Sequence, residues 1–435
     1  GGDLRSPPET LADLVAARLD FLPPVAVRVL QAAAVFGLVV RTDDLTDVLA
    51  SSVGRVELEA SLKLLSARDI VQAIDGELSF DHSMIRDVVY EATPLDVRRS
   101  LHDAAGDILI ASTSDPAVLG YHAERAGAMR RATELLSRAG DNATRQLDDH
   151  GASGLFQRAL NAARALPVIE QDESTQTTLA ELSIKLSSTL RSKGEIQRAR
   201  TILAEAKEQC RDAPRLHARL LRASAQLLGS EGDTPAAIHA YRQSIALAIR
   251  AFSLDVLAET YLELGAMLLR SGDSASAISE LEEAVDLITM GEGPASDNAP
   301  KQFWRLLLRL GQLHHTKGNS TKGRFLVQHA TRLATLHESP LGVARSLATM
   351  AGILEALGES DKAQDCRQRA IDGMRQLGDR RSTAELLLSG KRIGRASSQS
   401  EINDSYAQAH EARKLAEEVG WDEGVRQAQA NPGLR

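Results

Sequence analysis

The chain has 435 residues, of which 43% are hydrophobic, 25% charged and only 3% aromatic. This length suggests roughly two or three domains, and the abundance of Ala, Leu, Arg and Glu favours helices and argues against an all-β fold. The two cysteines, Cys210 and Cys366, have no other Cys or His at ligand spacing, which excludes disulfide scaffolds and zinc ribbons. Because no run of 18 apolar residues and no signal peptide is present, we expect a cytoplasmic protein.

Charge is unevenly distributed along the chain. Residues 1–110 contain 10 Lys and Arg against 18 Asp and Glu, a net charge of −8, whereas the remaining residues contain 41 of each. Nucleic-acid binding needs an excess of Lys and Arg that replaces counterions along the phosphates, so neither portion predicts it. The chain begins at Gly1 without an initiator Met, and we expect it to be a fragment of a longer protein.

The first elements predicted in chain order are helices. An apolar stripe follows Pro7-Pro8, and a second helix opens at Pro23-Pro24. Thr42 is expected to cap a third, short helix, and the spacing over 56–67 predicts a fourth.

The pattern then changes from helix to strand. Two short runs, 70–74 and 78–80, flank Asp75-Gly76-Glu77, whose Asp-Gly pair is typical of a tight β-hairpin turn. Helices followed by a hairpin predict a winged helix. A further helix is expected over 84–89, and another is expected to begin at a capping box, Thr93-Pro94-Leu95-Asp96.

Most of the remaining chain repeats itself. The clearest copy places Gly265 before a turn at Gly272-Asp273, followed by Ala277, Leu281 and Ala284. An early copy has its turn at Gly127, and later turns fall at Gly194, Gly232, Gly318 and Gly358. From 194 onward the turns are 38, 40, 46 and 40 residues apart, and Ser400-Glu401 takes the next slot.

This spacing predicts helical hairpins. The first small residue lets the two helices approach closely, the turn glycine ends the first helix in a left-handed conformation, and the following Asp or Glu caps the second helix. One hairpin cannot bury its own apolar face, so successive hairpins stack. Over about 115–420 the pattern resembles the tetratricopeptide repeat, although its period is nearer 40 than the roughly 34 residues of that family. We assign these small and aliphatic slots to packing.

The first hundred residues resemble a second family. The resemblance is carried by Pro8-Glu9-Thr10, by residues 17–23 and 28–37, and by residues 80–90 with 98–102. These runs are similar to the segment that follows the nucleotide-binding core in bacterial signal-transduction ATPases with numerous domains (STAND ATPases), among them large LuxR-type regulators and cyclase- or kinase-linked ATPases. The resemblance implies a winged helix that relays signals between an ATPase core and a repeat array.

The chain itself contains no phosphate-binding loop of the form G-x-x-x-x-G-K-[ST]. The nearest match, Gly390-Lys391, has Glu385 in place of the first Gly and Arg392 in place of Ser or Thr. We therefore expect no enzyme activity, no catalytic residue and no metal site in this chain. ATP or ADP with Mg²⁺ is expected only with an upstream ATPase core.

One residue is a candidate for nucleotide sensing. In the family that the chain resembles, a histidine of the winged helix contacts the phosphate of bound ADP, and His82 occupies the matching position at the start of a helix. The alternative is that His82 caps its own helix; for the preceding Asp81 we expect an N-cap role and no metal binding.

Several other candidates were weighed. DNA binding through the helix at 55–63 is the alternative function, but its two glutamates against two basic residues argue for an intramolecular role. We interpret His314-His315 as surface or packing residues. The basic run 391–397 is interpreted as a solvated helix end, with Ser397 as a phosphorylation candidate. Residues 291–298 are interpreted as a linker.

The sequence thus predicts an all-α chain with an N-terminal winged helix, which carries a small β-hairpin, followed by a tetratricopeptide-like α-solenoid. We divide it into a connector helix (1–22), a winged-helix domain (23–112) and a repeat array (113–435). The predicted function is the non-catalytic sensor arm of a STAND ATPase, binding a protein, a peptide or a small inducer. The alternatives are a DNA-binding regulator and a scaffold for a cyclase or kinase output domain. No membrane contact is expected. Several arginines are expected to face solvent on the repeats without selecting a ligand class: Arg222, Arg250, Arg270, Arg305 and Arg309.

Overall fold

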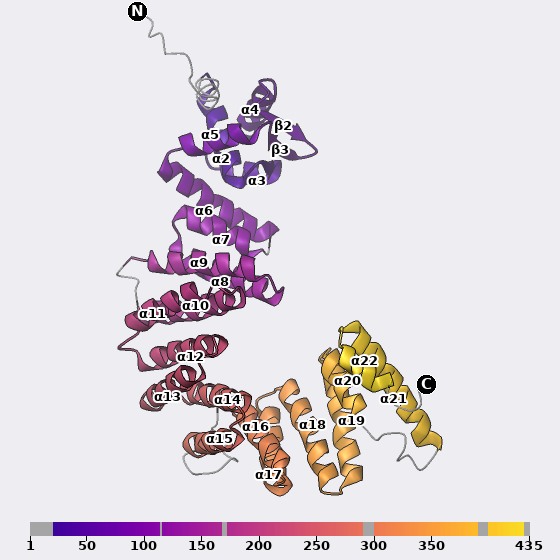
Figure 1. The fold of residues 1–435 in the computed structure, drawn as a ribbon. Helices are drawn as coiled ribbons and strands as arrows, with labels where there is room; N and C mark the ends of the chain where they lie inside the picture. Colours follow the sequence, from indigo (N-terminus) through magenta and orange to yellow (C-terminus); the bar gives the residue numbers. More distant parts are fainter. Residues whose placement is uncertain (1–20, 114, 168–171, 290–299, 390–398, 430–435) are drawn as a thin grey trace, which may run out of the picture. The chain divides into compact units, whose positions relative to one another are not determined.

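The computed structural model describes residues 21–113, 115–167, 172–289, 300–389 and 399–429. The chain divides into two compact units, one ending at Gln209 and the other beginning at Cys210. Both units are built from helices, apart from one small sheet near the N-terminus (Figure 1). Within the described ranges, no helix has the length and apolarity needed to cross a membrane.

The first unit opens with a mixed module, residues 22–112, here called the N-terminal module. Its elements in chain order are α2 (Pro24–Phe36), β1 (Val39–Arg41), α3 (Thr42–Leu49), α4 (Arg55–Ser66), β2 (Val71–Ile74), β3 (Glu77–Phe80), α5 (Ser83–Ala92) and α6 (Leu95–Ser112). The strands form an antiparallel sheet in the order β1-β3-β2. The predicted helices of this region are therefore present, and β1 is an additional strand that the sequence pattern did not indicate.

The hairpin between β2 and β3 forms at the predicted turn. Asp75 and Gly76 have φ angles of 53° and 81°, the left-handed pair that a two-residue hairpin turn of this type requires. Ile74 pairs with Glu77 across it. On the other side of β3, Val39 of β1 pairs with Ser79.

Two predicted helix caps are wrong. Thr42 is already the first residue of α3, whose N-cap is Arg41; the chain enters α3 directly from β1, and the Thr42 amide donates to the Gly76 carbonyl at 2.8 Å. The N-cap of α6 is Pro94, without a side-chain cap. Thr93 cannot form the capping box because its hydroxyl donates instead to the Val89 carbonyl of α5, at 2.7 Å.

Helix α2 forms the centre of the N-terminal module. It is apolar nearly all round and packs on β1, α3, α4, α5 and α6, as expected for a helix without a solvent face. Leu30 on α2, Leu45 on α3, Leu65 on α4 and Leu78 on β3 are almost completely buried in one shared core.

The helical hairpins begin after this module. In the first unit they comprise α7 (Pro116–Ala126), α8 (Met129–Arg145), α9 (Asp149–Arg164), α10 (Glu173–Ser192) and α11 (Ile196–Gln209). Each helix packs against the next one in the chain. Their contacts are thus between neighbours in the sequence, as in a solenoid.

The second unit continues the same architecture. Its helices are α12 (Pro214–Ser230), α13 (Thr234–Arg250), α14 (Leu254–Arg270), α15 (Ser274–Thr289), α16 (Phe303–Thr316), α17 (Ser320–Leu336), α18 (Pro340–Ala356), α19 (Ser360–Gln376), α20 (Arg380–Leu388), α21 (Gln399–Glu418) and α22 (Asp422–Gln429). Besides the contacts between successive helices, α12 contacts α14, α14 contacts α16 and α16 contacts α18. The first helices of the hairpins thus stack on one another (Figure 1), and the predicted all-α, tetratricopeptide-like solenoid is confirmed.

The predicted turn glycines have the expected left-handed backbone. Gly127, Gly194, Gly232, Gly272, Gly318 and Gly358 all have φ between 75° and 87°. Gly378 and Gly420 form further turns of this kind. The turn predicted at Ser400-Glu401 is wrong, because α21 already begins at Gln399; this segment has no glycine to interrupt a helix.

After the turn glycine, whether the next residue caps the following helix depends on the length of its side chain. The carboxylates of Asp233 and Asp273 accept hydrogen bonds from the amides of Ala236 and Ser276, at 3.1 and 2.9 Å. Glu359, in the same slot, makes no side-chain cap and instead accepts hydrogen bonds from Arg324 and Lys362. The predicted cap is therefore confirmed at these two aspartates and wrong at Glu359.

Small residues in the first helix of a hairpin pack against large side chains of the second helix. A Cβ on Gly120, Gly265 or Gly311 would lie 2.9, 3.2 or 2.6 Å from a side-chain atom of the residue sixteen positions later, in turn Leu136, Leu281 and Val327. Gly140 and Phe156 repeat this relation between α8 and α9, at 2.5 Å. The packing assignment of these slots is thereby explained by close helix approach.

The predicted connector (residues 1–22) lies almost wholly outside the described residues. The boundary proposed at residue 112 follows the end of α6, whereas the division into compact units falls between α11 and α12. The three-part domain assignment stays a prediction.

Candidate functional site

The sequence candidate His82 lies at the N-cap of α5 and is open to solvent. Its side chain is 77% exposed, its Nε2 atom lies 3.8 Å from the Asp81 carboxylate, and it makes no capping hydrogen bond. The N-cap position is thus not Asp81, whose Oδ1 instead accepts a hydrogen bond from Gln72 Nε2 at 2.6 Å. Neither predicted capping role is present, and the ring of His82 is free to meet a ligand.

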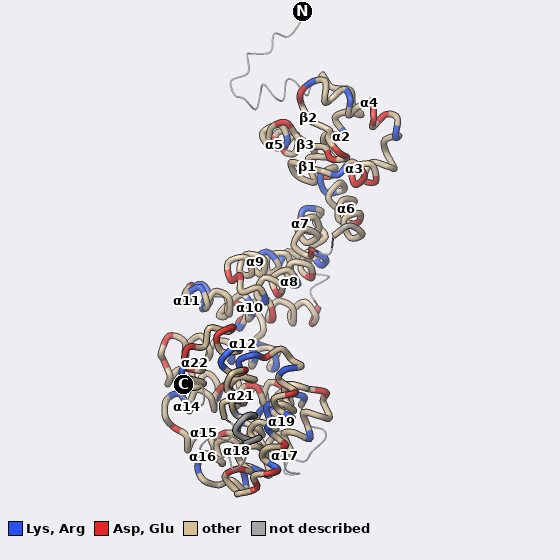
Figure 2. The backbone as a smooth tube through the Cα atoms, turned by 90° about the vertical axis from the view of Figure 1, so that its right-hand side faces the viewer, with Lys and Arg blue, Asp and Glu red and all other residues tan. Residues whose placement is uncertain are grey.

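Helix α4, the alternative DNA-contacting element, carries charges of both signs. Arg55 and Glu59 lie 3.7 Å apart on its exposed face, and Glu57 accepts a hydrogen bond from the Gly54 amide at 3.1 Å. Acidic residues also occupy the neighbouring α3 (Figure 2). The phosphates of DNA would therefore be repelled by carboxylates on this surface as well as attracted by its basic side chains.

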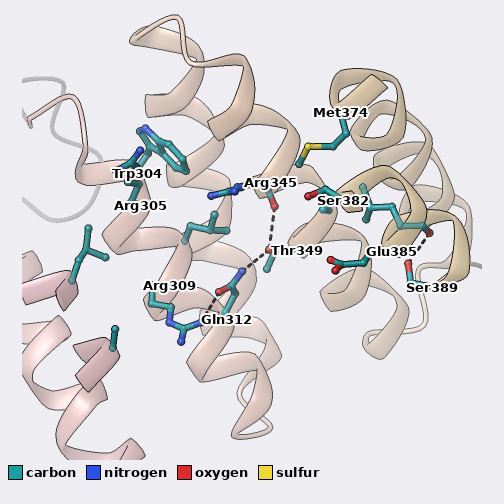
Figure 3. A pocket seen from close by; sticks show the side chains of 15 residues that line it. Trp304, Arg305, Arg309, Gln312, Arg345, Thr349, Met374, Ser382, Glu385 and Ser389 are labelled. Carbon is teal, nitrogen blue, oxygen red and sulfur yellow. Dashed lines mark hydrogen bonds between the residues drawn. The ribbon is translucent and has the colours of Figure 1, made fainter. Parts of the chain in front are cut away.

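The second unit contains a groove with a volume of about 850 Å³, here called the arginine groove. It is formed by residues from α14, α16, α18, α19 and α20 (Figure 3). Its lining residues are Leu262, Ala266, Trp304, Arg305, Leu308, Arg309, Gln312, Arg345, Ala348, Thr349, Met374, Ser382, Glu385, Leu386 and Ser389. Its volume is in the range of known ligand sites.

Three guanidinium groups occur in this groove. Arg305 and Arg309 are one helical turn apart on α16, and Arg345 lies on α18. All three side chains are exposed. Arg305 lies over the Trp304 ring at 5.5 Å, and Arg309 donates a long hydrogen bond to Gln312 Oε1 at 3.4 Å. None of the three has a carboxylate partner among the described residues.

Elsewhere in the repeats, arginines join helices two positions apart in the chain by ion pairs. The pairs are Arg158–Glu124, Arg164–Glu205, Arg215–Asp255, Arg242–Glu280, Arg324–Glu359 and Arg375–Glu411, with N–O distances of 2.6 to 2.9 Å. We call these pairs the inter-repeat ladder. Both basic and acidic residues accordingly occur along the repeat helices (Figure 2). The three arginines of the groove lie outside this ladder and converge on one cavity.

The carboxylates beside the groove are already bound to other arginines. On α14, Glu259 pairs with Arg222 of α12, which also lies 3.9 Å from Glu263. On α20, Glu385 accepts a hydrogen bond from Arg381 at 3.1 Å. The Arg222 side chain is only 15% exposed, so its predicted solvent-facing role is wrong, because Glu259 draws it into a contact between helices. The predicted exposure of Arg250, Arg270, Arg305 and Arg309 is confirmed.

An apolar floor lies beside the arginines. Trp304 is 4% exposed, yet it lines the groove together with Leu262, Leu308 and Met374. The opposite end of the groove is polar and comprises Ser382, Glu385 and Ser389 of α20 and its C-terminal turn (Figure 3). The groove thus has a cationic end, an apolar floor, and an opposite end where the Glu385 carboxylate can accept hydrogen bonds.

A second cluster of titratable groups lies buried in the first unit, between α5, α6 and α7. The Nδ1 atoms of His102 and His122 are 3.1 Å apart, and Tyr90 Oη lies 2.9 Å from His102 Nε2. The two histidines are 0% and 3% exposed. Burial, together with the proximity of His122, lowers the pKa of His102 to about 3, and burial lowers the pKa of His122 to about 4. Both rings are therefore neutral at physiological pH and join the N-terminal module to the first repeat hairpin.

His314 and His315 have structural partners. His314 Nε2 lies 3.1 Å from Glu282 Oε1, and His315 Nδ1 lies 3.0 Å from Ser320 Oγ. Burial lowers the pKa of His314 despite the nearby Glu282 carboxylate. In the ranges that the structure describes, no three His, Cys, Asp or Glu residues form a candidate metal site. The basic run 391–397 with Ser397, and the linker 291–298, lie outside those ranges.

The sequence reasoning missed Arg345 and the relation between the three arginines. Arg305 and Arg345 occupy one slot of consecutive repeats, forty residues apart, and aligning the repeats by their turn glycines would have shown them side by side. Whether each arginine has a partner depends on residues about forty positions away, which the local pattern does not contain.

Comparison with known proteins yields weak likenesses only. No protein-family model and no curated protein matches the chain. Similar solved structures include BtubC from P. vanneervenii, which is 16% identical, with a TM-score of 0.44 over 52% of this chain and 91% of that one. A STAND protein with a tetratricopeptide repeat sensor from Pyrococcus horikoshii is 13% identical, with a TM-score of 0.46 over 98% of this chain and 65% of that one. The apo form of RapI is 13% identical, with a TM-score of 0.40 over 66% of this chain and 99% of that one.

The present chain thus spans slightly less than two thirds of the STAND protein. At these identities and TM-scores, the fold described above rests on the helices of this chain itself.

Proposed function

We propose that this chain is a regulatory arm that binds a partner protein or peptide through its repeats. The observation that carries the proposal is the arginine groove. In it, three arginines that have no carboxylate partner in the part of the chain that the structure describes border an apolar floor on stacked helices. Solenoids of stacked hairpins present such surfaces because each repeat contacts only its neighbours and leaves one helix face free.

The groove is suited to recognition and not to bond chemistry. Its polar side chains are guanidiniums, hydroxyls, one amide and the Glu385 carboxylate. Among the described lining residues there is no histidine or cysteine that would pair with a hydroxyl as base and nucleophile. A ligand would be held there by ion pairs and apolar contact.

We further propose that the parent protein is a STAND-type ATPase and that the N-terminal module is its winged helix. The order helix, strand, helix, helix, hairpin in residues 24–80 supports this assignment, together with the motif resemblance of residues 80–90 and 98–102. ATP or ADP with Mg²⁺ would be held by an upstream core. Partner binding would act by shifting the balance between closed and open states of that core.

A site-specific crosslink tests the binding function. The photoreactive residue p-benzoylphenylalanine is introduced into the full chain at Ser389 or Gln312 in the groove, with Gln243 on α13 as the matched control outside it. We expect a discrete crosslinked polypeptide from the groove positions only, in cells that make the protein. Equal crosslinking from Gln243, or none from either groove position, would contradict partner binding in the groove.

His82 is proposed as the contact to the phosphate of ADP in the parent protein. Its exposed ring at the start of α5 would be able to donate to an anion there. In the parent protein, His82→Ala is expected to weaken ADP retention and raise basal activity. The control is Gln72→Ala, which removes the hydrogen bond to Asp81 and leaves the ring in place. Unchanged ADP affinity in the His82 variant would eliminate the sensor role.

The mixed charges of α4 do not favour DNA binding as the function. Gel shifts with residues 1–435 and a random 30-base-pair duplex at physiological salt are expected to show no complex. A stable complex that is lost in an Arg55→Gln, Lys63→Gln double variant would revive this alternative.

A further inference from the structure

We infer that the arginine groove recognises a short acidic stretch of an extended peptide, next to an aliphatic side chain. This inference rests on the proposed function and names the chemistry of the partner. It follows from three guanidiniums that no carboxylate of the described residues pairs, from the carboxylates that delimit them, and from the apolar floor beside them.

The charge of the groove changes in register with the repeats. One slot of consecutive first helices contains Glu259 on α14, Arg305 on α16, Arg345 on α18 and Glu385 on α20. The slot one helical turn later contains Glu263, Arg309, Thr349 and Ser389. Positive charge is thus confined to α16 and α18, between carboxylates on either side.

Those carboxylates do not neutralise the three arginines. Glu259 is paired with Arg222, and Glu385 accepts a hydrogen bond from Arg381. Arg222 also lies near Glu263, whose pKa is raised mainly by burial. Among the described residues no carboxylate pairs with Arg305, Arg309 or Arg345. Apart from the long hydrogen bond of Arg309 to Gln312, their donors remain for a ligand. A guanidinium fork matches a carboxylate with two parallel hydrogen bonds, which favours carboxylate ligands.

The length of the cationic surface selects a short anion. A nucleic acid presents a long row of phosphates and needs a continuous basic track, whereas here the track spans two helices and meets Glu263 or Glu385 beyond them. Two or three neighbouring carboxylates fit this span. The groove therefore favours an acidic peptide over DNA or RNA.

The apolar floor of the groove predicts that the peptide also carries an aliphatic side chain. Leu262, Leu308 and Met374 line the groove beside the arginines, and an aliphatic side chain buried against them adds apolar contact. At the far end, Glu385 would repel a further carboxylate and accept a hydrogen bond from a peptide amide or a basic group (Figure 3). The peptide is thus acidic at the α16 end and neutral or basic at the α20 end.

Selection from a random library tests this chemistry without a known ligand. The full chain, residues 1–435, is used to select phage-displayed 12-residue peptides, and selected peptides are remade with a fluorescent label for anisotropy titrations. We expect Asp and Glu beside Leu, Ile or Phe to be enriched. Replacing each acidic residue of a selected peptide by its amide should lower affinity about five- to tenfold.

Variants of the chain locate the binding. Arg305→Gln and Arg345→Gln should each weaken a selected acidic peptide about five- to tenfold, and the double variant more. Arg250 is also exposed and lies on α13, outside the lining of the groove. Arg250→Gln is therefore the matched control and should leave affinity unchanged. Circular dichroism of each variant confirms that the helices are retained.

The outcomes separate this inference from the proposed function. Selected peptides without acidic enrichment, or acidic peptides insensitive to both groove arginines, would overturn the acidic-ligand inference and leave groove binding standing. Stronger competition by a 12-base single-stranded oligonucleotide than by an unlabelled acidic peptide would also overturn it. If no peptide is selected and the groove crosslinks are absent as well, both the inference and the proposed function fail.

Discussion

The N-terminal module and the repeat array solve the problem of burying apolar surface in different ways. In the module, strand β1 pairs with β3 across forty residues, Val39 with Ser79, and one core around α2 joins nearly every element. In the array, each helix packs mainly on helices one or two positions away in the chain. The module therefore depends on long-range contacts, whereas the stability of the array is close to a sum of local interfaces.

The difference also separates the two kinds of surface. Where stability is local, one helix face per hairpin is not needed for folding, and this is where the arginine groove occurs. The module has no comparable free face on α2, which is buried nearly all round. The two ways of packing thus leave a free helix face on the array and none on α2.

The sharpest test of this comparison is a core truncation in each region. Leu65→Ala and Leu281→Ala each remove a fully buried side chain and should cost about 2–5 kcal/mol of local stability. Hydrogen exchange should accelerate over residues 24–92 in the first variant. In the second it should accelerate in α14–α16 and not across the rest of the second unit. Acceleration throughout the second unit would show that the array is as cooperative as the module.

A glycine substitution tests close helix approach in the array. A Cβ at Gly311 would lie 2.6 Å from Val327 Cγ2 and 3.1 Å from the Gly323 carbonyl oxygen, whereas a Cβ at Gly352 meets nothing within 4 Å. Gly311→Ala should therefore lower the free energy of unfolding by about 1–3 kcal/mol. Gly352→Ala, inside α18, should be neutral or stabilising by up to about 1 kcal/mol. Thermal unfolding compares them, and equal effects would refute the packing argument.

Acid should affect the first unit more than the second. The lowered pKa values of the buried His102 and His122, about 3 and about 4, mean that the unfolded chain, with an ordinary pKa near 6.5, binds more protons below that pH. Stability is thus fully present above about pH 6.5 and is lost as pH falls toward the folded-state values. Between pH 6.5 and 5.5 the loss should be about 1 kcal/mol for each histidine.

Hydrogen exchange of α5–α7 against pH measures this loss, with α18–α19 of the second unit, which contain no histidine, as the internal reference. His122→Gln should flatten the pH dependence of α5–α7. A slope that remains unchanged in this variant would assign the acid sensitivity to other groups.

The smallest expected effect concerns the helix caps of the array. Asp273→Ala removes the acceptor for the Ser276 amide and should cost about 0.5–1 kcal/mol. Glu359→Ala loses no cap, only partly exposed ion pairs with Arg324 and Lys362, and should cost less. Chemical denaturation ranks the two, and a larger loss for Glu359→Ala would show that ion pairs matter more than caps here.

The sequence was sufficient for features that local chemistry dictates. Gly272 and Gly318 predict their turns because a left-handed residue is needed there, and Asp75-Gly76 predicts the hairpin. The strand β1 could not be predicted, since three residues show no clear alternation and its pairing depends on β3. The caps at Thr42 and Thr93 failed for a related reason: the preceding elements, β1 and α5, occupy the groups that the caps would use.

The candidate site was less accessible to prediction. Arg305 and Arg309 were visible as surface arginines, but the sequence does not show which carboxylates are available to them. In the structure, Glu259 and Glu385 contact other arginines. The contact of His102 with His122 likewise depends on how α6 and α7 pack. Such relations are set by tertiary structure and not by the pattern of any single helix.

The inter-repeat ladder gives each stack of hairpins a dependence on ionic strength. Its side chains range from 15% to 61% exposed. Dissolved ions therefore screen the more exposed pairs, such as Arg215–Asp255, over a Debye length of about 8 Å at physiological concentration. Each ion pair contributes little to stability, about 0.2–1 kcal/mol, but the pairs recur between successive repeats. Added salt should therefore weaken the contacts between repeats and make the array more flexible, while the apolar contacts between its helices remain. The helices that line the groove would then move more easily relative to one another.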